Sequence, residues 1–158
     1  IGAALGHLIE AWELAMTGSD VPLGELADEE ATTVLLRPRR YMRLIIRDAV
    51  LKSWEPKRLV LDRRHPLVHA AITVDAVRYL VAEDGRRQAG NADDPHQMTL
   101  IWTLELTDSQ ETPWRLVASS NPAELIPGAW SPSGRARRTR LGALEARVAR
   151  RPRGSRGT

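Results

Sequence analysis

The hydrophobic period of this chain changes once, close to Trp54. Before that residue, apolar side chains recur every three or four positions, which is the spacing of one face of an amphipathic helix. After it, apolar and polar side chains alternate, which is typical of strands with one buried face. Because 158 residues suffice for about one hydrophobic core, this order predicts helices packed on a sheet in a single α+β domain.

Three helices are expected in the first part of the chain. The opening helix carries its apolar stripe on Leu5, Leu8, Ile9, Trp12 and Met16 and ends at Gly18. The second begins at an acidic turn, Asp28 to Glu30, and runs to about Leu36, since acidic side chains suit the positive end of a helix dipole. The third is expected from Pro38 to about Leu51.

The third expected helix carries a cationic stripe. Arg39, Arg43 and Arg47 are spaced four residues apart, so they would share one helix face. Arg37 and Arg40 add to the same cluster. Long cationic side chains beside an apolar face suit contact with anionic lipid headgroups, although a solvated face paired with acids remains the alternative.

Four strands are expected, over residues 57–63, 67–81, 97–106 and 114–118, with a polar loop over 83–95. On the second strand one face carries Val68, Ala70, Ile72, Val74, Ala76 and Leu80, and the other carries His69, Thr73, Asp75, Val77 and Tyr79. Hairpin connections predict an antiparallel meander whose apolar face is covered by the helices. We expect this sheet to be strongly twisted and the domain to be cone-shaped, with a concavity of the kind that binds small ligands.

The large aromatic side chains are expected to lie in the core. Trp12, Trp102 and Trp114 are assigned to the core or to a pocket wall, together with Leu104. We predict that ten residues are buried together: Leu5, Leu8, Trp12, Leu44, Ile45, Ile72, Leu100, Trp102, Leu104 and Leu116.

Charge divides the chain into two parts. Residues 131–158 hold nine arginines against one acid, a net charge of +8, whereas the rest of the chain has a net charge of −5. We therefore expect a domain over residues 1–125 and a Pro/Gly/Arg-rich basic tail without regular structure over 126–158. Such a tail suits an anionic membrane surface, an acidic partner or the phosphates of a nucleic acid, and it is the only segment expected to contact nucleic acid.

Several kinds of chemistry are not expected. The chain has no cysteine, which excludes disulfides, thiolate metal sites and a cysteine nucleophile. Its four histidines are too scattered for a metal motif, and it has neither a phosphate-binding glycine loop nor a nucleophile elbow. We therefore expect no metal and no cofactor.

Acid–base catalysis has one set of candidates. Asp75, Tyr79 and His69 share a face of the expected second strand, where a carboxylate or imidazole base and a phenol would flank one substrate. The same face is equally suited to lie against solvent, so these residues become catalytic only if the fold is that of an enzyme.

Two neighbouring strands carry a recognisable pattern. Trp102-Thr103-Leu104-Glu105 is followed by Pro113-Trp114-Arg115-Leu116-Val117-Ala118. This pair resembles the last two strands of the Tim-forty-four-like family, within the nuclear-transport-factor-two-like superfold, over roughly residues 1–120. Leu104 stands where the family has phenylalanine, and Pro113 where it has asparagine.

The resemblance implies a non-catalytic domain that lies at a membrane and holds translocation or secretion machinery. The expected location is cytoplasmic and peripheral to the inner membrane, compatible with an anchor upstream of Ile1. The expected partner is an anionic membrane surface or a membrane protein, contacted through Arg39, Arg43, Arg47, Arg135, Arg137, Arg138 and Arg140. Two alternatives remain: a SnoaL-like enzyme or ligand binder that uses the cone interior, and a ribosome- or nucleic-acid-associated adaptor that uses the tail.

Overall fold

The computed structural model describes residues 1–61 and 64–126. The helices are α1 (Gly2–Ala15), α2 (Val21–Leu26) and α3 (Glu29–Leu36), and the strands are β1 (Met42–Val60), β2 (Leu67–Ala82), β3 (Arg87–Leu106) and β4 (Trp114–Ser119). A 3-10 turn, η1 (Pro122–Leu125), follows β4. The strands form one antiparallel sheet in the order β1-β2-β3-β4. The expected α+β class, with three helices and a four-stranded antiparallel meander, is confirmed.

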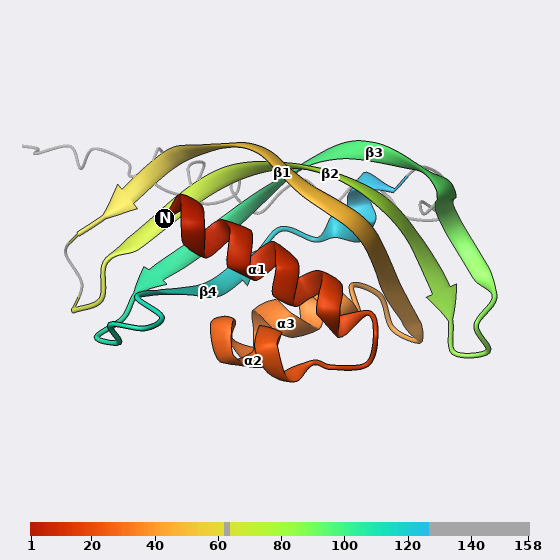
Figure 1. Ribbon diagram of the computed structural model, residues 1–158, viewed down its shortest axis with the longest axis horizontal. Helices are drawn as coiled ribbons and strands as arrows, with labels where there is room; N and C mark the ends of the chain where they lie inside the picture. Colours follow the sequence, from red (N-terminus) through yellow and green to blue (C-terminus); the bar gives the residue numbers. More distant parts are fainter. Residues whose placement is uncertain (62–63, 127–158) are drawn as a thin grey trace, which may run out of the picture.

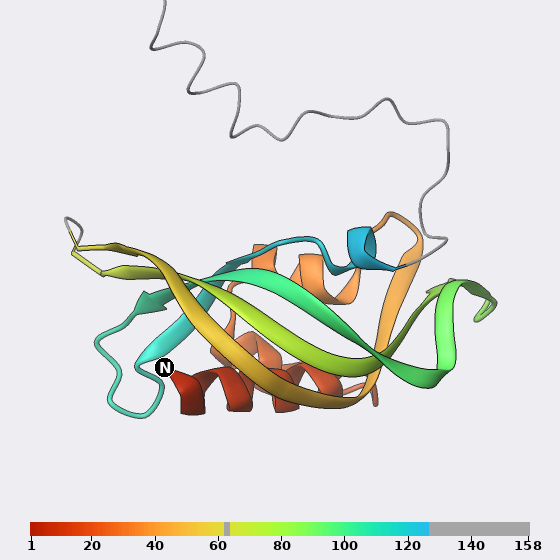
Figure 2. The ribbon, with the colours of Figure 1, turned by 90° about the horizontal axis from the view of Figure 1, so that it is seen from above.

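The sheet bends over the helices, which all lie against one of its faces (Figure 1). Seen from above, β1, β2 and β3 run along the length of the described fold (Figure 2). The six residues predicted for the core face of β2 are all buried: Val68, Ala70, Ile72, Val74, Ala76 and Leu80. Val77, predicted on the opposite face, is buried as well, and so is Arg78. The layer between helices and sheet is therefore an apolar core.

Two tryptophans occupy the centre of this core. Trp12 of α1 and Trp102 of β3 are both fully buried, and their ring centroids lie 6.2 Å apart at a tilt of 56°. Trp12 Nε1 donates a hydrogen bond of 3.2 Å to the carbonyl oxygen of Leu35, which ties α1 to α3. Tilted aromatic pairs add to the free energy of area burial, so this pair joins two helices and the sheet at one point.

The expected helix from Pro38 to Leu51 is wrong, because this segment is the beginning of β1. Leu44 and Ile46 alternate into the core, while Arg43 and Arg47 pair across the sheet with Val81 and Val77. The short apolar run Leu44-Ile45-Ile46 is compatible with the helical period of 3.6 residues and with the strand period of 2. Only pairing with another strand decides between helix and strand for such a run. Ile45, predicted to be buried, is therefore half-exposed, and Ile46 takes its place in the core.

The described part of the chain has three helices, as expected, although they differ from those predicted. α1 and α3 match their predictions closely, whereas α2, with Pro22 in its first turn, was not anticipated. The polar loop predicted over 83–95 is also wrong, since β3 begins at Arg87 and extends the β2–β3 hairpin almost to Glu83. Polar residues form long strands here because the pairing of β3 with β2 satisfies their backbone groups.

Candidate anion-binding site

A cleft of about 730 Å³ opens between the α3–β1 connection and the turn between β2 and β3. Both segments lie at the right-hand end of the molecule in Figure 1, below the bent sheet. The lining residues are Thr33, Arg37, Arg39, Arg40, Tyr41, Met42, Arg43, Val81, Ala82, Glu83 and Gly85. The cleft therefore gathers four arginines, and it includes Arg39 and Arg43 from the predicted lipid contacts.

The α3–β1 connection holds its arginines in a tight turn. Met42 N donates a 3.1 Å hydrogen bond to the Arg39 carbonyl oxygen, and Tyr41 adopts a positive φ of 61°, which is uncommon for a residue with a side chain. Asn121 Nδ2 donates to the Pro38 carbonyl oxygen at 3.1 Å and fixes the start of the turn. The Arg40 guanidinium carbon lies 4.8 Å from the centre of the Tyr41 ring, within the range of a cation–π interaction.

Most of the charge in the cleft is uncompensated. Within residues 1–61 and 64–126, Arg37, Arg39 and Arg40 form no ion pair. Arg43 is different, because one of its terminal nitrogens lies 3.7 Å from Asp20 Oδ1 and donates to the Ala15 carbonyl oxygen. The cleft thus presents three guanidinium groups without an ion pair, alongside the Glu83 side chain, and Arg43 joins β1 to the end of α1.

The helical stripe of Arg39, Arg43 and Arg47 does not exist. Arg39 precedes β1, and Arg43 and Arg47 are strand residues. Arg47 does not line the cleft; its side chain donates a 2.8 Å hydrogen bond to the Ala92 carbonyl oxygen on β3. Arg37, Arg39 and Arg40 therefore lie together in the turn that follows α3. Hydrophobic periodicity could not predict that this turn lies beside the β2–β3 hairpin, because the two segments are distant in the sequence.

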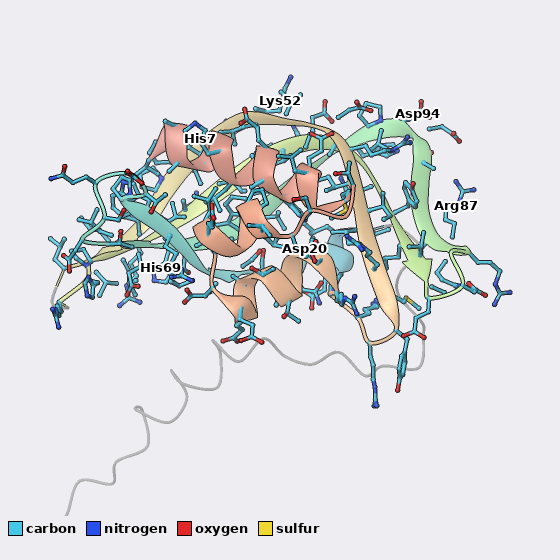
Figure 3. The ribbon with its side chains drawn as sticks, turned by 60° about the horizontal axis from the view of Figure 1, so that its bottom comes forward. His7, Asp20, Lys52, His69, Arg87 and Asp94 are labelled. Atoms are coloured by element: carbon cyan, nitrogen blue, oxygen red, sulfur yellow. The ribbon has the colours of Figure 1, made fainter. Side chains whose placement is uncertain are left out.

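The acid–base candidates lie on the other face of the sheet from the core. Asp75 pairs with Val50 and Gln97, while His69 Nδ1 lies 2.9 Å from Thr103 Oγ1. Figure 3 shows His69 at the opposite end of the molecule from Arg87 and Asp94 of the β2–β3 hairpin. Tyr79 is half-exposed beside that hairpin, paired with Gly90. The three residues are thus spread along the open face of β2.

One ionisable side chain does lie in the interior, and the sequence prediction did not identify it. Arg78 alternates with Ala76 and Leu80 on the core face of β2 and is only 6% exposed. Burial lowers the pKa of Arg78 from its ordinary value, and the nearby charge of Asp75 acts in the opposite direction. The sequence indicated this burial, because Arg78 falls between Ala76 and Leu80 on the apolar face of β2.

The remaining predicted contacts, Arg135, Arg137, Arg138 and Arg140, lie outside the described residues, as do positions 127–158 of the predicted tail. Ile126, predicted as the first tail residue, is buried in the core. Trp12, Trp102 and Leu104 are core residues, and Trp114 packs against the core while partly exposed. Among the described residues, no three histidine or acidic side chains are grouped closely enough to hold a metal ion. The helices of the described part are all too short or too polar to cross a membrane.

Comparison with known proteins gives no further guide to this site. Neither the family models nor the curated proteins include a match to this chain.

Proposed function

We propose that this protein is a non-catalytic scaffold or adaptor domain that lies on an anionic membrane surface, in the context of protein translocation or secretion. The observation that carries this proposal is the arginine-lined cleft, in which Arg37, Arg39 and Arg40 have no acidic partner within the described chain. Each arginine near a charged leaflet contributes on the order of 1 kcal/mol of binding free energy.

The turn that carries these arginines has the composition of an interfacial contact. Tyr41 is 62% exposed at the turn, with the Arg40 guanidinium over its ring. Tyrosine favours the headgroup level of a bilayer because its ring is apolar and its hydroxyl is polar. Arginine binds phosphate through paired N–H donors, so Arg39 and Arg40 of the same turn would hold headgroup phosphates.

We further propose that the domain is a Tim-forty-four-like member of the nuclear-transport-factor-two-like superfold, with a strongly twisted, cone-shaped sheet. Support comes from the order of the elements, helices first and then an antiparallel meander bent over them. The segments that carry the resemblance, Trp102-Thr103-Leu104 and Trp114-Arg115-Leu116, lie on the paired strands β3 and β4, with Leu104 opposite Leu116.

The scaffold proposal is favoured over an enzyme by the two faces of β2. Asp75 and His69 belong to the face that points away from the helices, and the core face that would line a cone interior is filled, apart from Arg78, by apolar side chains. A general base must reach its substrate within hydrogen-bond distance in a site that limits water. The open face of β2 offers Asp75 no such enclosure.

Vesicle co-sedimentation of the whole chain tests the proposal. Vesicles of neutral phosphatidylcholine are compared with vesicles that also contain an anionic phospholipid, and binding is expected only to the second kind. The double charge reversal Arg39→Glu, Arg40→Glu should lower the bound fraction more than the control Arg58→Glu, Arg87→Glu, which changes net charge equally at exposed positions outside the cleft.

Three results would reject the proposal: equal binding to both kinds of vesicle, no binding to either, or equal effects of the two double variants. Competition by RNA at low salt, with the cleft variant unaffected, would instead favour the adaptor that uses the basic tail.

A further inference from the structure

Arg78 is a buried cation whose polar contacts leave its charge unpaired. One terminal nitrogen donates to the His96 carbonyl oxygen at 2.7 Å, and the other donates to the Leu125 carbonyl oxygen at 3.0 Å. Nε is buried and has no hydrogen-bond partner, and no carboxylate of the described chain forms an ion pair with the guanidinium. Carbonyl groups satisfy part of its hydrogen-bonding capacity and none of its net charge.

Such an arrangement is costly in a folded protein. A charged group that is removed from water destabilises the fold unless an opposite charge or a full set of hydrogen bonds compensates it. Asp75 is the acid whose charge acts on Arg78, and it does so without direct contact. An anion at Arg78 would supply the missing charge.

A small cavity adjoins this side chain. Its volume is about 210 Å³, and Arg78, Gly90, Asn91, His96 and Ile126 line it. None of these residues lines the arginine-lined cleft. In liquid water one molecule occupies roughly 30 Å³, so the cavity has room for a ligand of only a few heavy atoms.

The cavity wall at Gly90 is built by a close approach of two strands. Gly90 has a φ of 92°, and a Cβ added there would lie 2.6 Å from the Arg78 carbonyl oxygen and 2.7 Å from Tyr79 Cα. Only glycine allows β3 to lie this close to β2 at that point. The β2 backbone at Arg78 is thereby packed directly against the β3 backbone at Gly90, beside the cavity.

We propose that this cavity binds a small monocarboxylate, with its anionic group against Arg78 and its short alkyl chain against Ile126. One guanidinium balances one negative charge, and the nearby charge of Asp75 disfavours a dianion such as phosphate. His96 also lines this cavity, and a ring N–H of its imidazole would offer a further donor to a bound carboxylate.

The proposal is tested by calorimetric titration of the whole chain with sodium acetate, propionate and butyrate, against sodium chloride and phosphate at equal ionic strength. Saturable binding of propionate or butyrate is expected, without matching binding of chloride or phosphate. Arg78→Met should weaken the affinity by more than about tenfold, the effect of losing a charge-assisted hydrogen bond.

Two further variants keep the test independent of folding defects. His96→Trp fills the cavity but keeps the backbone carbonyl that Arg78 uses, so it should abolish binding even if Arg78→Met fails to fold. Arg87→Met removes an exposed arginine of the same hairpin and should bind as the parent does, as should the cleft variant Arg39→Glu, Arg40→Glu. Absence of carboxylate binding in the parent, binding unchanged by His96→Trp, or tighter binding of phosphate would each overturn the proposal.

Discussion

The Glu13 carboxylate accepts a hydrogen bond of 2.6 Å from the backbone N–H of Asp48, 35 residues further along the chain. Its second oxygen lies 3.4 Å from the N–H of Ala49. The pairing of β1 with β2 is interrupted between Arg47 and Val50, and Asp48 there has a positive φ of 53°. A side chain of α1 therefore satisfies the backbone donors that this bulge removes from the sheet.

Removal of that carboxylate should destabilise the fold. Glu13→Ala leaves two N–H groups without their acceptor, and we expect a loss of about 1 kcal/mol in the free energy of unfolding, measured by urea denaturation. Glu10→Ala is the matched control, because Glu10 is exposed on the same helix and should change stability little. Equal losses for the two variants would show that the contact with the bulge contributes nothing.

Trp102→Ala should cost about 3–5 kcal/mol, enough to unfold a domain of ordinary stability. The change removes a fully buried ring from its contact with Trp12 and opens a cavity between helices and sheet. Trp54→Ala serves as the comparison, since Trp54 is 37% exposed and should cost less. A Trp102→Ala variant that melts within a degree or two of the parent would contradict the assigned core.

Gly90→Ala and Gly85→Ala separate steric overlap from backbone strain. Both glycines have positive φ, but a Cβ at Gly85 meets nothing within 4 Å, whereas one at Gly90 overlaps the β2 backbone. We expect about 1 kcal/mol of destabilisation at Gly85 from conformation alone and more than about 2 kcal/mol at Gly90. Thermal melting of the two variants side by side measures the difference, and similar values would argue against the close approach of β2 and β3.

Asp75→Asn and His69→Ala should leave vesicle binding unchanged, because both residues lie on the open face of β2 and outside the cleft. The measurement is the bound fraction in co-sedimentation, with circular dichroism to verify the fold. Loss of a measurable turnover in either variant with the fold preserved would favour the enzyme over the scaffold.

Salt should weaken vesicle binding steeply. The Debye length falls from about 10 Å at 0.1 M salt to about 3 Å at 1 M, so contacts between exposed arginines and headgroups are screened. Deletion of residues 131–158, which carry a net charge of +8, should lower the affinity further, and the cleft arginines should account for most of what remains. Binding that is insensitive both to salt and to this deletion would exclude an electrostatic mechanism.

The site could be predicted only in part. Arginine clustering around Arg37 to Arg43 is visible in the sequence, and so is the unusual position of Arg78 within an apolar alternation. The cleft itself was not predictable, since its second wall comes from the β2–β3 hairpin, which begins at Val81, 38 residues after Arg43 of the first wall. Helical periodicity assigned Arg43 and Arg47 to the wrong kind of element, because local spacing contains no information about the strand with which they pair.

The sequence by itself determined the features that depend on local pattern: the amphipathic stripe of α1, the acidic start of α3, the buried face of β2 and the meander of hairpin-linked strands. Hydrophobic burial at a fixed period is a local property, so it can be inferred from spacing alone. Only the tertiary structure decided that residues 42–51 form a strand, that Glu13 satisfies the bulge at Asp48, and that Arg78 lies buried beside a cavity. These outcomes depend on partners distant in the sequence, and the free energy of such contacts overrides local preference wherever that preference is weak.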